Sequence, residues 1–207
     1  MQSPVDIHLL VEGSVDAAIA RTLIRVCGAS PGMERITRGK STLVGVLPKY
    51  NAAANFQPWL AIRDLDHDAE CAPLLVQGNL PAPNPLMCFR VAVREAESWL
   101  MADREVFATA MGVSMALVPT KPEILEDPKL TVVNLARRSR RREIRLGLVP
   151  EPDAGISTGP EYAAWMIEFA ERTWDPIRAA DGGDVPSLSK ALGGIQRLIN
   201  SARESNN

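Results

Sequence analysis

The sequence predicts an α/β fold in which a mainly parallel, four-stranded sheet is flanked by helices and followed by a helical C-terminal extension. Short apolar runs alternate with helix-like segments through residues 5–93. This β-α-β-α-β-α-β order favours parallel strands, because each crossover between parallel neighbours needs a connection of helix length. After residue 93 the strand-like runs stop. A chain of 207 residues is long enough for one generous domain or for a domain with a helical appendage.

The strands are expected where apolar residues cluster between turn-forming residues. They are expected at residues 5–11, 33–37, 57–63 and 86–93. The helices between them are expected at residues 14–26, 41–54 and 69–76. Gly28 ends the first helix and Pro48 is expected to interrupt the second.

The second half of the chain is expected to be helical. Helices are predicted at residues 95–101, 103–111, 130–145, 161–174 and 187–202. Asp103 is a suitable N-cap, and Gly193-Gly194 should weaken the last helix. We therefore expect an α/β domain at residues 1–112 and a helical extension at residues 113–207. The extension is expected to cover the sheet, within one single domain, rather than to form an independent one.

Composition excludes several classes of protein. Apolar residues make up 46% of the chain, charged residues 23%, and the net charge is -2, which argues against a uniformly basic nucleic-acid coat. Cys27, Cys71 and Cys88 form no C-x-x-C pair, so neither a zinc site nor a disulfide framework is expected. The start of the chain lacks a basic n-region, and no apolar run reaches membrane-spanning length. A cytoplasmic location without membrane contact is expected.

Acidic residues follow two of the predicted strands. Glu12 comes directly after the first strand, and the run Asp64-Leu65-Asp66-His67-Asp68 follows the third. Parallel strands place such residues at the same edge of a sheet, where open α/β sheets bind ligands. Because Mg²⁺ prefers oxygen ligands and often acts together with phosphates, this pattern predicts a Mg²⁺ or Mn²⁺ site. The alternative is that these are ordinary polar residues at the ends of strands, without a role in function.

Lys40 lies in the segment Gly39-Lys40-Ser41, which is similar to the end of a phosphate-binding P-loop. The first glycine of that motif would fall at position 34, which is Glu34, so a P-loop ATPase is not expected. Two interpretations of Lys40 stay open. It reaches a substrate phosphate from the loop after the second strand, or it is a plain surface lysine.

Four segments resemble known families. Residues 12–16 (Glu-Gly-Ser-Val-Asp) and 64–66 (Asp-Leu-Asp), each after a strand, resemble the Toprim domain of topoisomerases, bacterial primases, old-family nucleases and recombination mediators. Residues 95–103 resemble the Glu-x-Glu-x-Trp-Leu-x-Ala-Asp signature of small stand-alone Toprim-like bacterial proteins of unassigned function. Residues 186–188 match their C-terminal Pro-Ser-Leu element. The resemblance covers most of the chain, and the segment at residues 95–103 is its most specific part.

The resemblance implies roles for individual residues. Glu12 would act as a general acid or base near a phosphodiester. Asp64 and Asp66 would hold Mg²⁺, and Asp68 extends the pattern towards a second ion.

Glu95 and Glu97 match the signature of the stand-alone family, and the resemblance makes both candidates for the catalytic site. If the fourth strand is parallel to the first, Glu95 reaches the same sheet edge as Glu12, whereas Glu97 points elsewhere around the following helix. The alternative is that both are solvated glutamates favoured by a helix N-terminus.

An arginine run lies in the predicted helix at residues 130–145. Its members are Arg137, Arg138, Arg140, Arg141, Arg142 and Arg145. At helical spacing Arg137, Arg141 and Arg145 would share one face, with Arg138 and Arg142 beside it. Such a band could follow the phosphates of a nucleic acid, although charge runs are often only solvated faces.

The sequence thus predicts a Mg²⁺-dependent phosphodiesterase, a nuclease, acting on DNA or RNA. The alternative is a non-catalytic Toprim-like adaptor that binds nucleic acid or an ATPase partner, since stand-alone relatives are often encoded beside ATPases. A third interpretation, hydrolysis of a small phosphate ester, would use the same carboxylates without the arginine run.

Overall fold

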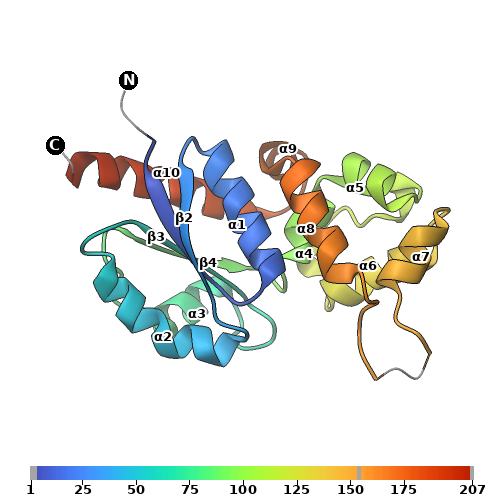
Figure 1. Ribbon diagram of the computed structural model, residues 1–207, viewed down its shortest axis with the longest axis horizontal. Helices are drawn as coiled ribbons and strands as arrows, with labels where there is room; N and C mark the ends of the chain where they lie inside the picture. The colour runs from blue at the N-terminus through green and yellow to red at the C-terminus, as the bar shows by residue number, and fades with distance from the viewer. Residues whose placement is uncertain (1–3, 153–154, 206–207) are drawn as a thin grey trace. The chain divides into compact units, whose positions relative to one another are not determined.

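The computed structural model describes residues 4–152 and 155–205. These residues form two compact units (Figure 1). The first contains the described residues up to Val93 together with those from Pro186 onwards, and the second runs from Arg94 to Val185. The division falls earlier than the expected boundary at residue 112, and the C-terminal helix belongs to the sheet-containing unit.

The first unit is built on a parallel four-stranded sheet, as the sequence predicts. Its strands are β1 (Asp6–Val11), β2 (Ser30–Ile36), β3 (Trp59–Asp64) and β4 (Met87–Ala92). Their order in the sheet is β2-β1-β3-β4, and every neighbouring pair is parallel. Val11, the last residue of β1, lies opposite Ile36 on one side and Ile62 on the other. The carboxyl ends of the three strands β1, β2 and β3 therefore meet at one edge.

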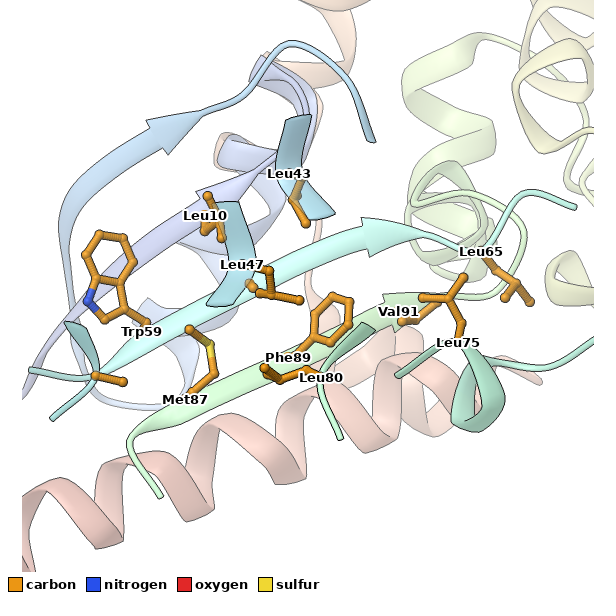
Figure 2. Packing of buried hydrophobic residues seen from close by; sticks show 12 residues of the cluster. Leu10, Leu43, Leu47, Trp59, Leu65, Leu75, Leu80, Met87, Phe89 and Val91 are labelled. Atoms are coloured by element: carbon orange, nitrogen blue, oxygen red, sulfur yellow. The ribbon is translucent and has the colours of Figure 1, made fainter. Parts of the chain in front are cut away.

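Helices cover both faces of this sheet. They are α1 (Ser14–Val26), α2 (Lys40–Ala53), α3 (Ala72–Asn79) and α10 (Pro186–Ser205). Figure 1 shows α1 and α10 on one face and α2 and α3 on the other. Beneath α2 and α3 the buried side chains of Leu10, Leu47, Trp59 and Phe89 pack together (Figure 2). Burial of this apolar surface is the main driving force for holding the helices on the sheet.

The expectation that Pro48 interrupts the second helix was wrong, because Pro48 lies inside α2 without ending it. The last helix, α10, runs unbroken through Gly193 and Gly194. Gly194 has a packing role, because a Cβ at this position would collide with the guanidinium of Arg90 on β4. Because Gly194 has no side chain, the guanidinium of Arg90 can lie directly against α10.

Among residues 94–152 and 155–185 the second unit contains helices and turns but no strand. Its α-helices are α4 (Glu97–Ala102), α5 (Arg104–Met111), α6 (Pro128–Arg137), α7 (Arg142–Leu148), α8 (Tyr162–Arg172) and α9 (Pro176–Gly182). Its core includes Phe107, which meets Phe169 edge to face at a centroid distance of 5.3 Å. In the described part of the chain, no helix has both the length and the apolar character that a membrane crossing requires.

The single helix expected at residues 130–145 is instead two helices. α6 ends at Arg137 and α7 begins at Arg142, so residues 138–141 form a turn. The sequence pattern missed this break because arginines favour helices and hide the role of Ser139, which is buried. The arginine run therefore cannot form the continuous helical band that its spacing predicts.

Candidate functional site

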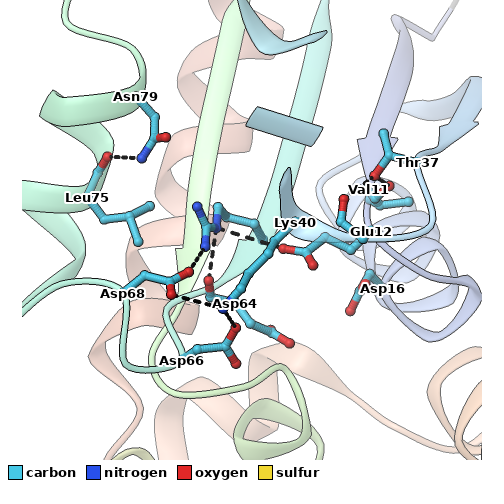
Figure 3. Close-up of polar contacts among 12 residues, drawn as sticks. Val11, Glu12, Asp16, Thr37, Lys40, Asp64, Asp66, Asp68, Leu75 and Asn79 are labelled. Carbon is cyan, nitrogen blue, oxygen red and sulfur yellow. Dashed lines mark hydrogen bonds and ion pairs between the residues drawn. The ribbon is translucent and has the colours of Figure 1, made fainter. Parts of the chain in front are cut away.

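The carboxyl edge of the sheet brings together Glu12, Lys40, Asp66 and Asp68 (Figure 3). Glu12 follows β1, Asp64 ends β3, and the turn after β3 carries the other two aspartates. Because β1 and β3 are neighbours in the sheet, segments about fifty residues apart emerge side by side.

Glu12 sits in a sharp turn between β1 and α1. The Gly13 backbone N–H donates to Asp16 Oδ2 at 2.9 Å, and the Gly13 carbonyl accepts from the backbone N–H of Ala17 at 3.1 Å. Asp16 thus caps the first turn of α1, where a carboxylate is favoured by the helix dipole. This capped start keeps Glu12 at the sheet edge.

The loop that carries Lys40 is tied to the end of β1. Thr37 donates to the Val11 carbonyl from its backbone N–H at 2.9 Å and from Oγ1 at 3.2 Å. The Arg38 N–H donates to the Glu12 carbonyl at 2.9 Å. Arg38 and Gly39 have φ values of 59° and 134°, a left-handed conformation for which glycine is favoured. Lys40 is therefore held at the start of α2, beside Glu12.

The turn after β3 is anchored by Leu65, whose side chain is buried. Its backbone N–H donates to the Ala92 carbonyl on β4 at 2.9 Å, and its carbonyl accepts from the Asp68 N–H at 3.1 Å. Asp66 has a φ of 47°, which aspartate tolerates better than most residues. In this conformation the side chain of Leu65 points into the core, and the side chains of Asp66 and Asp68 stay partly exposed.

Two positively charged side chains, those of Lys40 and Arg63, lie between these carboxylates. Lys40 Nζ donates to Asp66 Oδ2 and to Asp68 Oδ1, both at 2.9 Å (Figure 3). The hydrogen bond to Asp68 is the main cause that raises the pKa of Lys40, and the same bond lowers the pKa of Asp68. Arg63 forms an ion pair with Asp68 Oδ2, and its Nε lies 3.8 Å from Glu12 Oε1. The structure therefore links Glu12 to both aspartates through Arg63 and Lys40.

Glu12 has the chemistry expected of a proton-transfer group. Its Oε1 is buried and has no hydrogen-bond partner among the described residues. Burial raises the pKa of the Glu12 carboxyl, and the nearby charge of Arg63 partly opposes that rise. A carboxyl whose pKa is raised by burial exchanges a proton at a pH closer to neutrality, as general acid–base catalysis requires.

Arg63 is the residue that the sequence interpretation missed. It belongs to β3, and only 3% of its surface is exposed. A buried arginine needs partners, because an unpaired charge in the interior is costly. The available signal was a charged residue directly after the apolar run 59–62, one position before Asp64.

Glu95 and Glu97 lie in the second unit, within a cluster of their own. Glu95 accepts hydrogen bonds from the Lys129 backbone N–H at 2.8 Å and from its Nζ at 3.2 Å. The buried Glu97 accepts from the Tyr162 hydroxyl at 3.1 Å and lies 3.8 Å from Lys129 Nζ. Burial, followed by the charge of Glu97, raises the pKa of Tyr162, so this phenol stays protonated.

The expected nucleic-acid residues are divided between helix ends and the turn. Arg137 ends α6, Arg142 and Arg145 belong to α7, and Arg138 and Arg141 lie between the two helices. Arg137 donates to Asn134 Oδ1 at 2.6 Å, a contact within α6. The face shared by Arg137, Arg141 and Arg145 therefore does not exist, because no single helix carries all three.

The donor chemistry of the sheet edge suits a hard cation, since its acceptors are carboxylate oxygens. In the arrangement described, Lys40 and Arg63 stand between the carboxylates, and no group of three or more His, Cys, Asp or Glu residues in the described part of the chain is placed to hold a metal ion. The edge thus combines a buried carboxyl with a neutralised pair of aspartates. No family model, no curated protein and no solved structure matches this chain.

Proposed function

We propose that this protein is a Toprim-like, Mg²⁺-dependent phosphodiesterase that cleaves nucleic acid at the carboxyl edge of the sheet in its first unit. The observation that carries the proposal is the convergence of Glu12 with Asp66 and Asp68 at the ends of two neighbouring parallel strands. Lys40 lies against the same aspartates and adds a group that can bind a phosphate.

The residues present fit a magnesium or manganese ion in their donor chemistry. Asp64, Asp66 and Asp68 offer only oxygen ligands, which hard divalent cations prefer. Glu12 Oε1 is a buried acceptor without a hydrogen-bond partner among the described residues. When bound, such an ion would polarise a phosphoryl oxygen and neutralise developing negative charge. Its entry requires that Lys40 leave Asp66 and Asp68.

The side chains of the site would then have separate roles. Glu12 would accept the proton of the attacking water at its carboxylate, a task that its raised pKa suits. Lys40, once released from the aspartates, would bind a phosphate oxygen of the substrate. Arg63 would act as a positioning residue, because it contacts both Glu12 and Asp68 from the buried side.

A cleavage assay tests this proposal. Plasmid DNA and a single-stranded RNA are incubated with the protein in Mg²⁺ or Mn²⁺, and the variants Glu12→Gln and Asp66→Asn are compared with wild type. Loss of a positioned general base lowers the rate by about 10²–10⁴-fold. Asp181→Asn, an exposed residue of the second unit, is the matched control and should keep wild-type activity. Equal cleavage by wild type and both site variants would falsify the assignment.

A second function, the non-catalytic adaptor, is favoured by a specific observation. The charges of Asp66 and Asp68 are already neutralised by Lys40 and Arg63, so no metal ion is needed to offset the repulsion between the two carboxylates. A calorimetric Mg²⁺ titration separates the two functions. Binding of nucleic acid or of an ATPase partner, without Mg²⁺ binding and without cleavage, would favour the adaptor.

A further inference from the structure

The turn between α6 and α7 (residues 138–141) and Arg142, the first residue of α7, are here together called the arginine turn. We propose that it is a binding surface for the phosphodiester backbone of a nucleic acid, with Arg138, Arg140 and Arg142 as the contact residues. This surface belongs to the second unit and needs neither a metal ion nor hydrolysis. It therefore goes beyond the proposed activity and can be tested separately from it.

Ser139 holds the arginine turn against the end of α5. The Ser139 side chain is buried, and its Oγ donates to the Met111 carbonyl at 2.6 Å and accepts from the Arg141 N–H at 3.0 Å. The Arg140 N–H donates to the Gly112 carbonyl at 2.9 Å. These bonds connect the turn to a helix almost thirty residues earlier. The backbone of the turn is thus fixed before any partner binds.

Two of the arginines build the turn instead of facing a partner. Arg145 donates from its guanidinium to the Ser139 carbonyl, and Arg141 donates to the Ala110 carbonyl at 3.1 Å. Gly112 has a φ of 72°, and a Cβ at this position would lie 2.8 Å from Arg141 Cγ. The close approach of Arg141 therefore depends on a glycine. This division of roles was hidden in the sequence, where all the arginines look alike.

Arg138, Arg140 and Arg142 are left for a partner. All three are exposed, and none forms an ion pair or side-chain hydrogen bond with another described residue. Like charges held close together on a fixed backbone repel one another, and a polyanion relieves that repulsion. The guanidinium group also matches a phosphate in a bidentate geometry.

The composition of the surface favours a nucleic acid over an acidic protein. From residue 137 to residue 143 every exposed side chain is charged, and all but Glu143 are arginines. Protein interfaces usually contain an apolar or aromatic centre, whereas interfaces with nucleic acids are polar and strongly positive. Contacts of this kind bind the backbone and carry no direct sequence information.

Fluorescence anisotropy with a labelled 20-nucleotide single strand and the matching duplex tests the proposal. The buffer contains EDTA, so the outcome does not depend on cleavage or metal binding. The triple variant Arg138→Ala, Arg140→Ala, Arg142→Ala is compared with wild type over a range of salt concentrations. Because each lost phosphate contact lowers the salt slope of binding by about 0.7–0.9, the slope should fall by about 2–3 and the affinity at low salt by at least about tenfold.

The matched control removes the same charge from the first unit. The variant Lys49→Ala, Lys190→Ala, Arg203→Ala changes three exposed residues there and should bind like wild type. The triple variant Arg138→Lys, Arg140→Lys, Arg142→Lys should keep the salt slope but bind more weakly, because it keeps the charge and loses the planar guanidinium groups. Equal loss in the control triple, or an unchanged slope in the alanine triple, would overturn the proposal. Competition by a poly-glutamate peptide as strong as that by DNA would instead assign the turn to an acidic protein partner.

Discussion

Replacing Lys40 with methionine should strengthen the binding of Mn²⁺ to the sheet edge. The ammonium group bridges Asp66 and Asp68 at 2.9 Å to each, so it competes with any cation for the same oxygens. Methionine keeps the length of the side chain and removes the charge. The variant is therefore expected to gain metal affinity while losing cleavage activity, a combination that a merely damaged site would not show.

The magnitude follows from the exposure of the three groups. The side chains of Lys40, Asp66 and Asp68 are 42%, 31% and 35% exposed, so each ion pair is screened by water. Exposed pairs contribute about 0.2–1 kcal/mol each, and two of them about 0.4–2 kcal/mol. Since about 1.4 kcal/mol corresponds to a factor of ten, the dissociation constant for Mn²⁺ should fall by about twofold to thirtyfold.

Isothermal titration calorimetry with Mn²⁺ at low ionic strength measures this change. Lys49→Met is the matched control, because Lys49 is an exposed residue of the same helix, α2. The difference between wild type and Lys40→Met should shrink when the ionic strength rises to about 1 M, because salt weakens ion pairs between partly exposed groups. Weaker or unchanged binding in Lys40→Met refutes the competition. No binding in any of the three proteins refutes the metal site itself.

Three further predictions concern the charged groups of the two units. The pKa of Glu12 is raised by burial, so its contribution to stability is lost as the pH rises through the raised pKa. Urea unfolding should therefore show Glu12→Gln gaining stability relative to wild type as the pH rises from 4.5, the usual pKa of this group, through the raised pKa, and a constant difference would contradict this. Arg63→Met removes the main group that lowers the pKa of Glu12, so the acid limb of the pH–rate profile should move to higher pH. Arg178→Ala breaks bonds of 2.7 and 2.6 Å to Asp103, whose side chain is 2% exposed, and should cost about 2–3 kcal/mol in urea unfolding. Adding Asp103→Asn to that variant should recover part of the loss, and a purely additive second loss would show that the pair is uncoupled.

The sheet and its acidic edge could be predicted because their signals are local. Each of the apolar runs that form β1, β3 and β4 is a short continuous segment of the chain, and each crossover contains its own helix. Parallel strands with such crossovers have their carboxyl ends at one edge, so the sequence alone predicts that Glu12 and the aspartate run lie together.

The partners of those acids could not be predicted, because they depend on side-chain packing between distant segments. Lys40 meets Asp68 across 28 residues of sequence, and Arg63 meets Glu12 only because β1 and β3 are adjacent in the sheet order. The same holds for the arginine turn. The buried Ser139 hydrogen-bonds to the end of α5, just after α6 has ended at Arg137. The arginines around Ser139 give a helical sequence pattern, and that pattern conceals the break.

The sequence by itself therefore determined the class of fold and the edge at which acidic groups gather, because strand and helix periodicity and the direction of parallel strands follow from local chemistry. Tertiary structure alone decided which cations neutralise those acids and which arginines are left for a partner. Both depend on free energies of contact between residues far apart in the chain, and such contacts exist only after the strands have been ordered and the helices packed.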